Sequence, residues 1–130
     1  MNIAETRQQL LKDIQQIRQT VSLEFKTLSE AQLLWKPAPE RWGILECLVH
    51  LNAASQYYTN QLKLKFSQSP IHSSATDFEM SFNGKMMLGF VDPASPRKIP
   101  SPGMFKPKPY HLDAPKVLER YFMILQDLEN

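Results

Sequence analysis

The sequence predicts an all-α fold, and three observations lead to this class. Apolar residues recur at the spacing of amphipathic helices in three long segments, which begin near residues 3, 43 and 114. Helix-capping signals stand at the start of several segments. Seven of the ten prolines fall between Pro93 and Pro115, so this part is expected to be extended and irregular. We therefore expect a helical domain with a long proline-rich crossover at about residues 67–111.

The first segment has one apolar stripe and no helix breaker. Neither Gly nor Pro occurs between residues 2 and 36, and a helix is expected over about residues 3–27. A second start signal follows at Ser29-Glu-Ala-Gln32, which matches a capping box. The short helix that it opens must end near Trp35, because Pro37 and Pro39 follow. Residues 36–42 are therefore expected to form a rigid, extended turn.

The next long helix is expected to begin at Gly43 and to run to about Ser67. Glu46 is placed to accept a hydrogen bond from the backbone N–H of Gly43, as in half of a capping box. The expected centre of its buried face consists of Ile44, Leu48, Leu51, Ser55, Tyr58 and Leu62. His50 lies roughly 120° from that centre, on the same edge as Tyr57. Its position predicts a place at the rim of a groove rather than in the core.

Two further helices are expected in the second half of the chain. Apolar spacing between Phe78 and Val91 indicates a helix inside the crossover. Asp113 is placed as the N-cap of the last helix, with Pro115 in its first turn. The apolar pattern of that helix is still running at Asn130. We therefore expect residues 1–130 to be a single helical domain that is incomplete at its C-terminal end.

Length and composition exclude several classes of protein. A chain of 130 residues has the size of one domain, and its net charge is +2. No basic stripe lies on the expected helices, so a nucleic-acid partner is not expected. No apolar run approaches the roughly 20 residues that span a membrane, so no membrane partner is expected. The single cysteine, Cys47, excludes an internal disulfide, and the cytoplasm is the expected compartment.

Three motifs resemble the DinB/YfiT-like superfamily of metal-dependent enzymes. The first is Leu28-Ser-Glu-Ala-Gln-Leu-Leu-Trp-Lys-Pro-Ala-Pro, which is similar to the turn after that family's first helix. The second is Trp42-Gly-Ile-Leu-Glu-Cys-Leu-Val-His-Leu, which is similar to the family signature Trp-Ser-Ile-x-Glu-x-x-x-His-Leu. The third lies in the crossover, where Gly84-Lys, Arg97-Lys-Ile-Pro-Ser-Pro and Phe105-Lys-Pro resemble one branch of the family.

The resemblance implies a fold and a type of chemistry. The implied fold is an up-down four-helix bundle with a long connection between the second and third main helices. The implied cofactor is a divalent metal, often nickel or zinc, that three histidines hold. One of these corresponds to His50, and the other two come from a His-x-x-x-His pair on the last helix. Some members of the family are thiol transferases that use bacillithiol or a similar small thiol.

The chain departs from the family pattern in two places. No His-x-x-x-His pair occurs, and the remaining histidines, His72 and His111, fall in the crossover. A fourth main helix does not fit before Asn130, so the last helix of the bundle is expected to be missing from this chain. Gly43 stands where the family signature has Ser, which removes a capping hydroxyl and keeps the spacing.

Each candidate site residue has a functional and a structural interpretation. His50 is the candidate metal ligand, and a helix histidine without a functional role is the alternative. Glu46 either orients the His50 ring as a neighbouring carboxylate or only caps the helix. Trp42 and Tyr57 are the candidate pocket-lining residues, and tryptophans beside a proline-rich turn also close the ends of bundles. Cys47 is expected to be a buried, inert thiol rather than a nucleophile.

Basic residues of the crossover allow two readings as well. Arg97, Lys98, Lys106 and Lys108 are close in sequence with no acidic residue among them. They either attract an anionic thiol or carboxylate or belong to a solvated loop.

Two functional hypotheses follow for the whole chain. The first is a metal-dependent thiol transferase or hydrolase of the DinB type, which uses a small-molecule thiol or another small substrate. The second is a non-catalytic helical module that keeps the scaffold without the metal site. In both cases, a bundle that lacks its last helix exposes apolar surface, so a homo-oligomer is expected.

Overall fold

The computed structural model describes residues 1–68, 74–96 and 98–130, and it is built from helices. The long helices are α1 (Ile3–Thr20), α3 (Ile44–Gln68) and α5 (Ala114–Glu129). The shorter ones are η1 (Val21–Phe25), α2 (Glu30–Leu34), α4 (Phe82–Val91), η2 (Gly103–Phe105) and η3 (Pro109–His111). Residues 1–68, 74–96 and 98–130 contain no β-strand, only an isolated bridge between Asn2 and Asp77. The predicted all-α class is confirmed.

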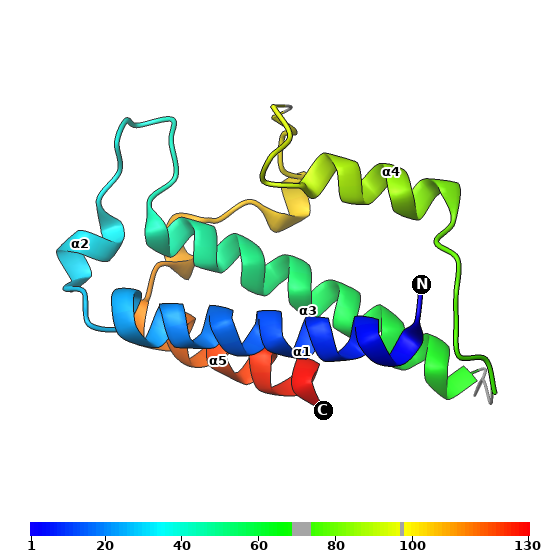
Figure 1. Cartoon of the computed structure of the whole chain (residues 1–130). Helices are drawn as coiled ribbons and strands as arrows, with labels where there is room; N and C mark the ends of the chain where they lie inside the picture. Colours follow the sequence, from blue (N-terminus) through cyan, green and yellow to red (C-terminus); the bar gives the residue numbers. More distant parts are fainter. Residues whose placement is uncertain (69–73, 97) are drawn as a thin grey trace.

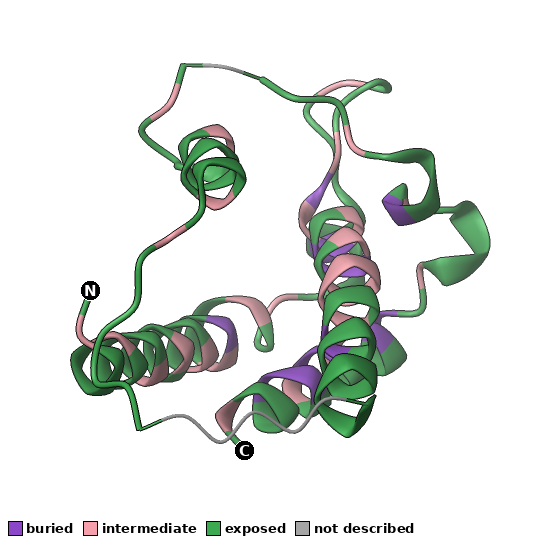
Figure 2. Ribbon diagram, turned by 90° about the vertical axis from the view of Figure 1, so that its right-hand side faces the viewer, coloured by how far each residue is buried: buried purple, intermediate pink, exposed green. Residues whose placement is uncertain are grey.

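The three long helices form the body of the molecule. Helix α5 contacts both α3 and α1, and its contact with α3 is the more extensive. Figure 1 shows α1, α3 and α5 running side by side, with α2 at one end. Figure 2 shows α4 set apart from these three helices, at the side where α1 and α3 face one another. Helix α5 therefore joins α1 and α3 into one bundle, because it contacts both of them.

Most of the helix-start signals in the sequence work as predicted. The Ser29 hydroxyl accepts from the Gln32 N–H at 3.2 Å, and the Gln32 side chain accepts from the Ser29 N–H at 2.9 Å. Asp113 accepts from the Lys116 N–H at 3.2 Å and begins α5. These bonds satisfy backbone donors that the first turn of a helix leaves without partners.

The end of the first helix differs from the expectation of a uniform α-helix. Residues Val21–Phe25 form a π-helical turn, in which the Lys26 N–H donates to the Val21 carbonyl at 2.8 Å. A π-turn inserts one residue and rotates the chain that follows it. Val21 is buried, and both Phe25 and Leu28 pack against the same core. The wider turn thus lets this helix end contribute three apolar side chains to one cluster.

The buried face of α3 differs from the predicted one. Its core residues are Leu45, Leu48 and Val49, with Thr59 further along. Of the predicted centre, Leu51 is 43% exposed, and Tyr58 and Leu62 are exposed too. The prediction was right for Leu48 and wrong for these three residues, because α3 packs mainly on α5, whereas its side toward α1 is not covered. The buried face is rotated by about one residue position as a result.

The crossover contains the predicted helix and little buried surface. Helix α4 begins after Ser81, whose hydroxyl accepts from the Gly84 N–H at 3.1 Å. The segment before it is bound to the N-terminus, since the Ile3 N–H donates to the Thr76 carbonyl at 2.8 Å. No residue of α4 is buried. His72 and Arg97 lie outside the described residues. None of the described helices is both long and apolar enough to cross a membrane.

The rotated face of α3 makes a stability prediction. Leu45 is fully buried, with 0% of its surface exposed, so Leu45→Ala is expected to lower the free energy of unfolding by about 2–5 kcal/mol. Leu51→Ala on the same helix is the matched control and is expected to cost less than about 1 kcal/mol. Urea denaturation of both variants measures the difference. Equal losses, or a larger loss for Leu51→Ala, would contradict this packing.

Candidate functional site

His50 lies two turns into α3 and is held through one ring nitrogen. Its Nδ1 atom is 3.1 Å from the carbonyl oxygen of Phe105 and 3.2 Å from the hydroxyl oxygen of Ser101. A carbonyl oxygen only accepts, so Nδ1 must carry the ring proton to form this bond. The Ser101 hydroxyl donates to the Pro102 carbonyl at 3.1 Å, which leaves its oxygen able to accept as well. The Phe105 carbonyl therefore favours the tautomer with the proton on Nδ1, which leaves Nε2 with its lone pair.

Aromatic rings surround this histidine on two sides. The ring centroid of Trp42 is 5.1 Å from that of His50, and the Phe105 ring lies 6.4 Å away, edge-on. Phe105 is itself only 6% exposed, and its ring packs against Tyr57 and Tyr58 at 5.6 and 6.0 Å. The crossover is thus attached to α3 at one aromatic cluster, and His50 belongs to it. Local helix structure and a residue from the far side of the crossover together place the imidazole.

The two predicted pocket-lining residues belong to different cavities. Trp42 lines a largely apolar groove of about 730 Å³ between α1 and α3, with Tyr121 of α5 also in its wall. Tyr57 lines a cavity of about 500 Å³ between α3, α5 and the crossover. The structure therefore brings Trp42 to His50 directly, and it links Tyr57 to His50 only through Phe105.

Glu46 caps the helix on which His50 lies. One of its carboxylate oxygens accepts from the Gly43 N–H at 3.2 Å and lies 3.4 Å from the Lys36 ammonium. The described contacts of the His50 ring go instead to Phe105 and Ser101. The capping interpretation is confirmed by the hydrogen bond to Gly43. The orienting role that the sequence suggested for Glu46 is filled in this geometry by the Phe105 carbonyl.

A steric constraint, which the sequence did not reveal, explains why residue 43 is a glycine. A Cβ atom at this position would overlap the carbonyl oxygen of Trp35, the residue that ends α2. The side chain of Ser, which the family signature carries here, would therefore push the two segments apart. Trp35 is exposed, so of the two tryptophans only Trp42 is partly enclosed. Glycine at position 43 allows the residue before α3 to lie in close contact with the carbonyl group of Trp35, directly after α2.

Cys47 is exposed, which corrects the expectation of a buried thiol. It lines the groove between α1 and α3. Partial desolvation by its neighbours, and then the negative charge of Glu46, raise the pKa of the Cys47 thiol above its ordinary value. A thiol with a raised pKa holds its proton at neutral pH and is a poor nucleophile. Partial burial of the thiol and the neighbouring Glu46 carboxylate thus both favour its protonated form, in line with the expectation that Cys47 is not a nucleophile.

The surroundings of His50 are compatible with one ligand of a metal site, but they do not form a complete metal site. A ligating histidine usually donates its second ring N–H to a carbonyl or carboxylate, as His50 does to Phe105. Catalytic zinc-type sites use three protein ligands. The described residues contain no group of three His, Cys, Asp or Glu side chains that would hold an ion. Among the described residues, the hydrogen bonding of His50 is compatible with one bond to a metal, and no second or third ligand lies grouped with it.

Sequence reasoning missed Ser101 and Phe105 as partners of His50. They lie 51 and 55 residues further along the chain, so no local spacing relates them to it. One signal was present, because Phe105 is a large aromatic residue in a proline-rich stretch, and aromatic side chains supply much of the buried apolar surface of a protein.

These features define the class of the protein: an all-α bundle with a histidine positioned on its second long helix and a long crossover that returns to it. The family model described as the DinB superfamily matches residues 13–129. The chain belongs to the DinB superfamily. No curated protein and no solved structure matches it.

The contact between Gly43 and Trp35 makes a second prediction. Gly43→Ser restores the family hydroxyl but introduces the Cβ overlap, and we expect it to lower the free energy of unfolding by about 1–3 kcal/mol. Gly89→Ser in α4 is the matched control, because nothing lies within 4 Å of a Cβ at Gly89. Thermal unfolding of the two variants compares them. A Gly43→Ser protein as stable as the wild type would contradict the steric explanation.

Proposed function

We propose that the protein is a metal-dependent thiol transferase or hydrolase of the DinB type, in which His50 supplies one ligand to a divalent ion. The observation that supports this proposal is the contact between His50 and the Phe105 carbonyl. Nδ1 lies 3.1 Å from that oxygen, and a hydrogen bond donated there leaves Nε2 as the donor atom for a metal.

Nickel and zinc are the proposed ions. Neutral imidazole is a suitable ligand for both, and a single histidine does not choose between them. A bound divalent ion of this kind supplies one kind of chemistry, the lowering of the pKa of a thiol or water. The residues of this chain contribute the position of His50, its tautomer, and the aromatic walls of Trp42 and Phe105. The proposed substrate class is a small-molecule thiol or another small substrate, and the proposed compartment is the cytoplasm.

The test separates the metal bond of His50 from its structural hydrogen bond. In His50→Asn, the side-chain amide can keep a donor near the Phe105 carbonyl, but it has no counterpart of Nε2. We expect the wild type to purify with nickel, zinc, manganese or iron, and His50→Asn to lose at least about nine-tenths of it while unfolding at a similar temperature. Elemental analysis and thermal unfolding give the two readouts.

His111→Ala is the control, since it removes an exposed crossover histidine. It is expected to keep the metal content of the wild type. A wild type with less than about a tenth of an equivalent of metal would overturn the proposal. So would a His50→Asn protein that retains its metal.

A non-catalytic helical module is the second candidate function. It is favoured by the donor set, because the described part of the chain offers only His50 where a catalytic site needs three ligands. In this case His50 only joins α3 to the crossover. The measurement above decides between the two candidates, since a module of this kind would hold no metal in either the wild type or His50→Asn.

Self-association is proposed for either function. The groove between α1 and α3 is lined by apolar side chains, including the half-exposed Ile17 and Leu51. Exposed apolar surface of this kind favours association. We expect light scattering at micromolar concentration to give the mass of a homodimer or a larger oligomer, compared with 15.0 kDa for one chain. A monodisperse species at the mass of one chain would contradict this expectation.

A further inference from the structure

We infer that the cavity between α3, α5 and the crossover is a second binding site, which takes a small organic anion with an apolar body. This cavity has a volume of about 500 Å³, within the range of small-molecule sites. His50 does not line it, and the groove beside Trp42 is a separate hollow. The inference therefore does not rest on the proposed metal function.

The charge of the cavity wall indicates the sign of the ligand. Lys106 of the crossover and Lys116 and Arg120 of α5 all line it. No Asp or Glu is among its lining residues. Lys116 forms an ion pair with Asp113 at 4.0 Å within the first turn of α5. Three cations from two segments thus meet at one cavity in a chain whose net charge is only +2. Convergent charge of one sign attracts the opposite charge.

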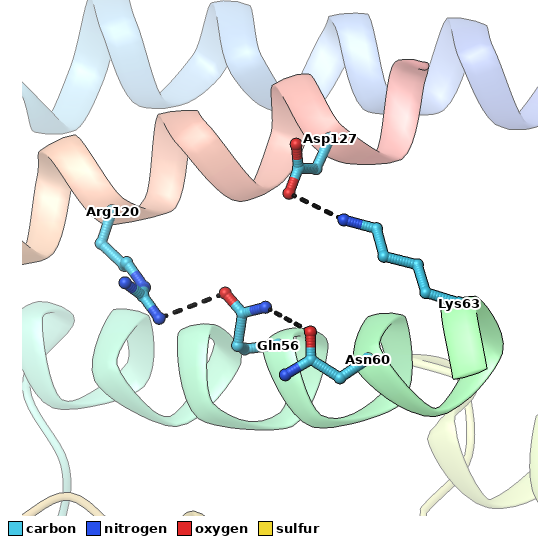
Figure 3. A network of polar contacts seen from close by, with 5 residues as sticks. All are labelled: Gln56, Asn60, Lys63, Arg120 and Asp127. Carbon is cyan, nitrogen blue, oxygen red and sulfur yellow. Dashed lines mark hydrogen bonds and ion pairs between the residues drawn. The ribbon is translucent and has the colours of Figure 1, made fainter.

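A polar network places the guanidinium of Arg120 at this wall (Figure 3). Its Nη2 atom donates to the Gln56 side-chain oxygen at 3.2 Å, and the Gln56 amide nitrogen donates to the Asn60 oxygen at 2.9 Å. Both amide residues also line the cavity. The carboxylate drawn nearby, Asp127, lies 3.4 Å from Lys63 and makes no described contact with Arg120. Arg120 is therefore oriented by neutral groups, and its positive charge is not neutralised by a carboxylate.

The rest of the wall sets the other properties of the ligand. Val49, Ala53, Met104 and Val117 give the cavity apolar surface. Asn52 donates through its nitrogen to the Val117 carbonyl at 3.1 Å, which fixes the orientation of its amide. Its oxygen is buried and has no partner among the described residues. The wall therefore combines apolar surface for the body of the ligand with an amide whose orientation is fixed.

Carboxylates and phosphate esters share the required chemistry. A guanidinium binds either one through paired hydrogen bonds, while the two lysines act as point charges. The three cationic side chains are exposed, so each contributes only weakly to binding. A dissociation constant in the millimolar range, about 1 mM, is expected for a minimal probe that also contacts the apolar wall.

The experiment uses benzoate and phenyl phosphate as probes and benzamide as the neutral analogue. Binding to the full chain is measured by calorimetric titration and by ¹⁵N–¹H NMR, in which the amides of α5 and the crossover should shift. We expect both anions to bind and benzamide not to bind. Arg120→Gln and Lys106→Gln are each expected to weaken binding about fivefold. If only one of the two anions binds, the result shows whether the site takes a carboxylate or a phosphate ester.

Lys12→Gln is the matched control, because it removes the same charge from exposed surface on α1. It should bind both anions like the wild type. Thermal unfolding of each variant shows whether it is folded. If Arg120→Gln does not fold, Lys106→Gln still tests the contribution of the positive charge at the cavity wall. Equal affinity for benzamide and the anions would overturn the inference. Unchanged anion binding in Lys106→Gln and Arg120→Gln, or no binding at about ten times the expected constant, would overturn it too.

Discussion

The attachment of Phe105 to α3 is the contact on which the other features of the candidate site depend. Its ring is buried against Tyr57, Tyr58 and His50, and burial of such a side chain contributes roughly 1.5–3 kcal/mol. Its carbonyl accepts from the His50 ring in the same place. One residue therefore brings the long crossover back to the body of the protein and also fixes the tautomer of the histidine. Loss of this contact would release both at once.

Helix α3 separates two surfaces of different character. One side faces α1 across an apolar groove in which Trp42 and Cys47 lie. The other side faces α5 and the crossover, and its cavity has Lys106 and Arg120 in the wall. Met104 and Lys106, the neighbours of Phe105, reach the second cavity directly. The same anchor thus shapes the basic cavity and positions His50, and Tyr57, which packs on Phe105, also lines that cavity.

The sequence predicted those features that depend on residues close together in the chain. The caps at Ser29 and Asp113, and the hydrogen bond from Gly43 to Glu46, involve neighbours three residues apart, and all were confirmed. The features that were missed depend on long-range packing. Leu51 is exposed because α3 packs on α5 and its side toward α1 is uncovered, and the partner of His50 lies 55 residues away. Helical periodicity shows that a face is apolar, but not which element covers it.

The proposed role of His50 depends on which of its two ring nitrogens carries the proton. Long-range ¹⁵N–¹H NMR of the imidazole side chains, at a pH where the ring is neutral, measures this tautomer, and His50→Asn assigns the signal. The structure predicts that His50 is protonated at Nδ1 and that Nε2 is an unprotonated acceptor. A His50 ring that carries its proton on Nε2, or that exchanges freely between both tautomers, would contradict the Phe105 contact and the preparation of His50 as a ligand.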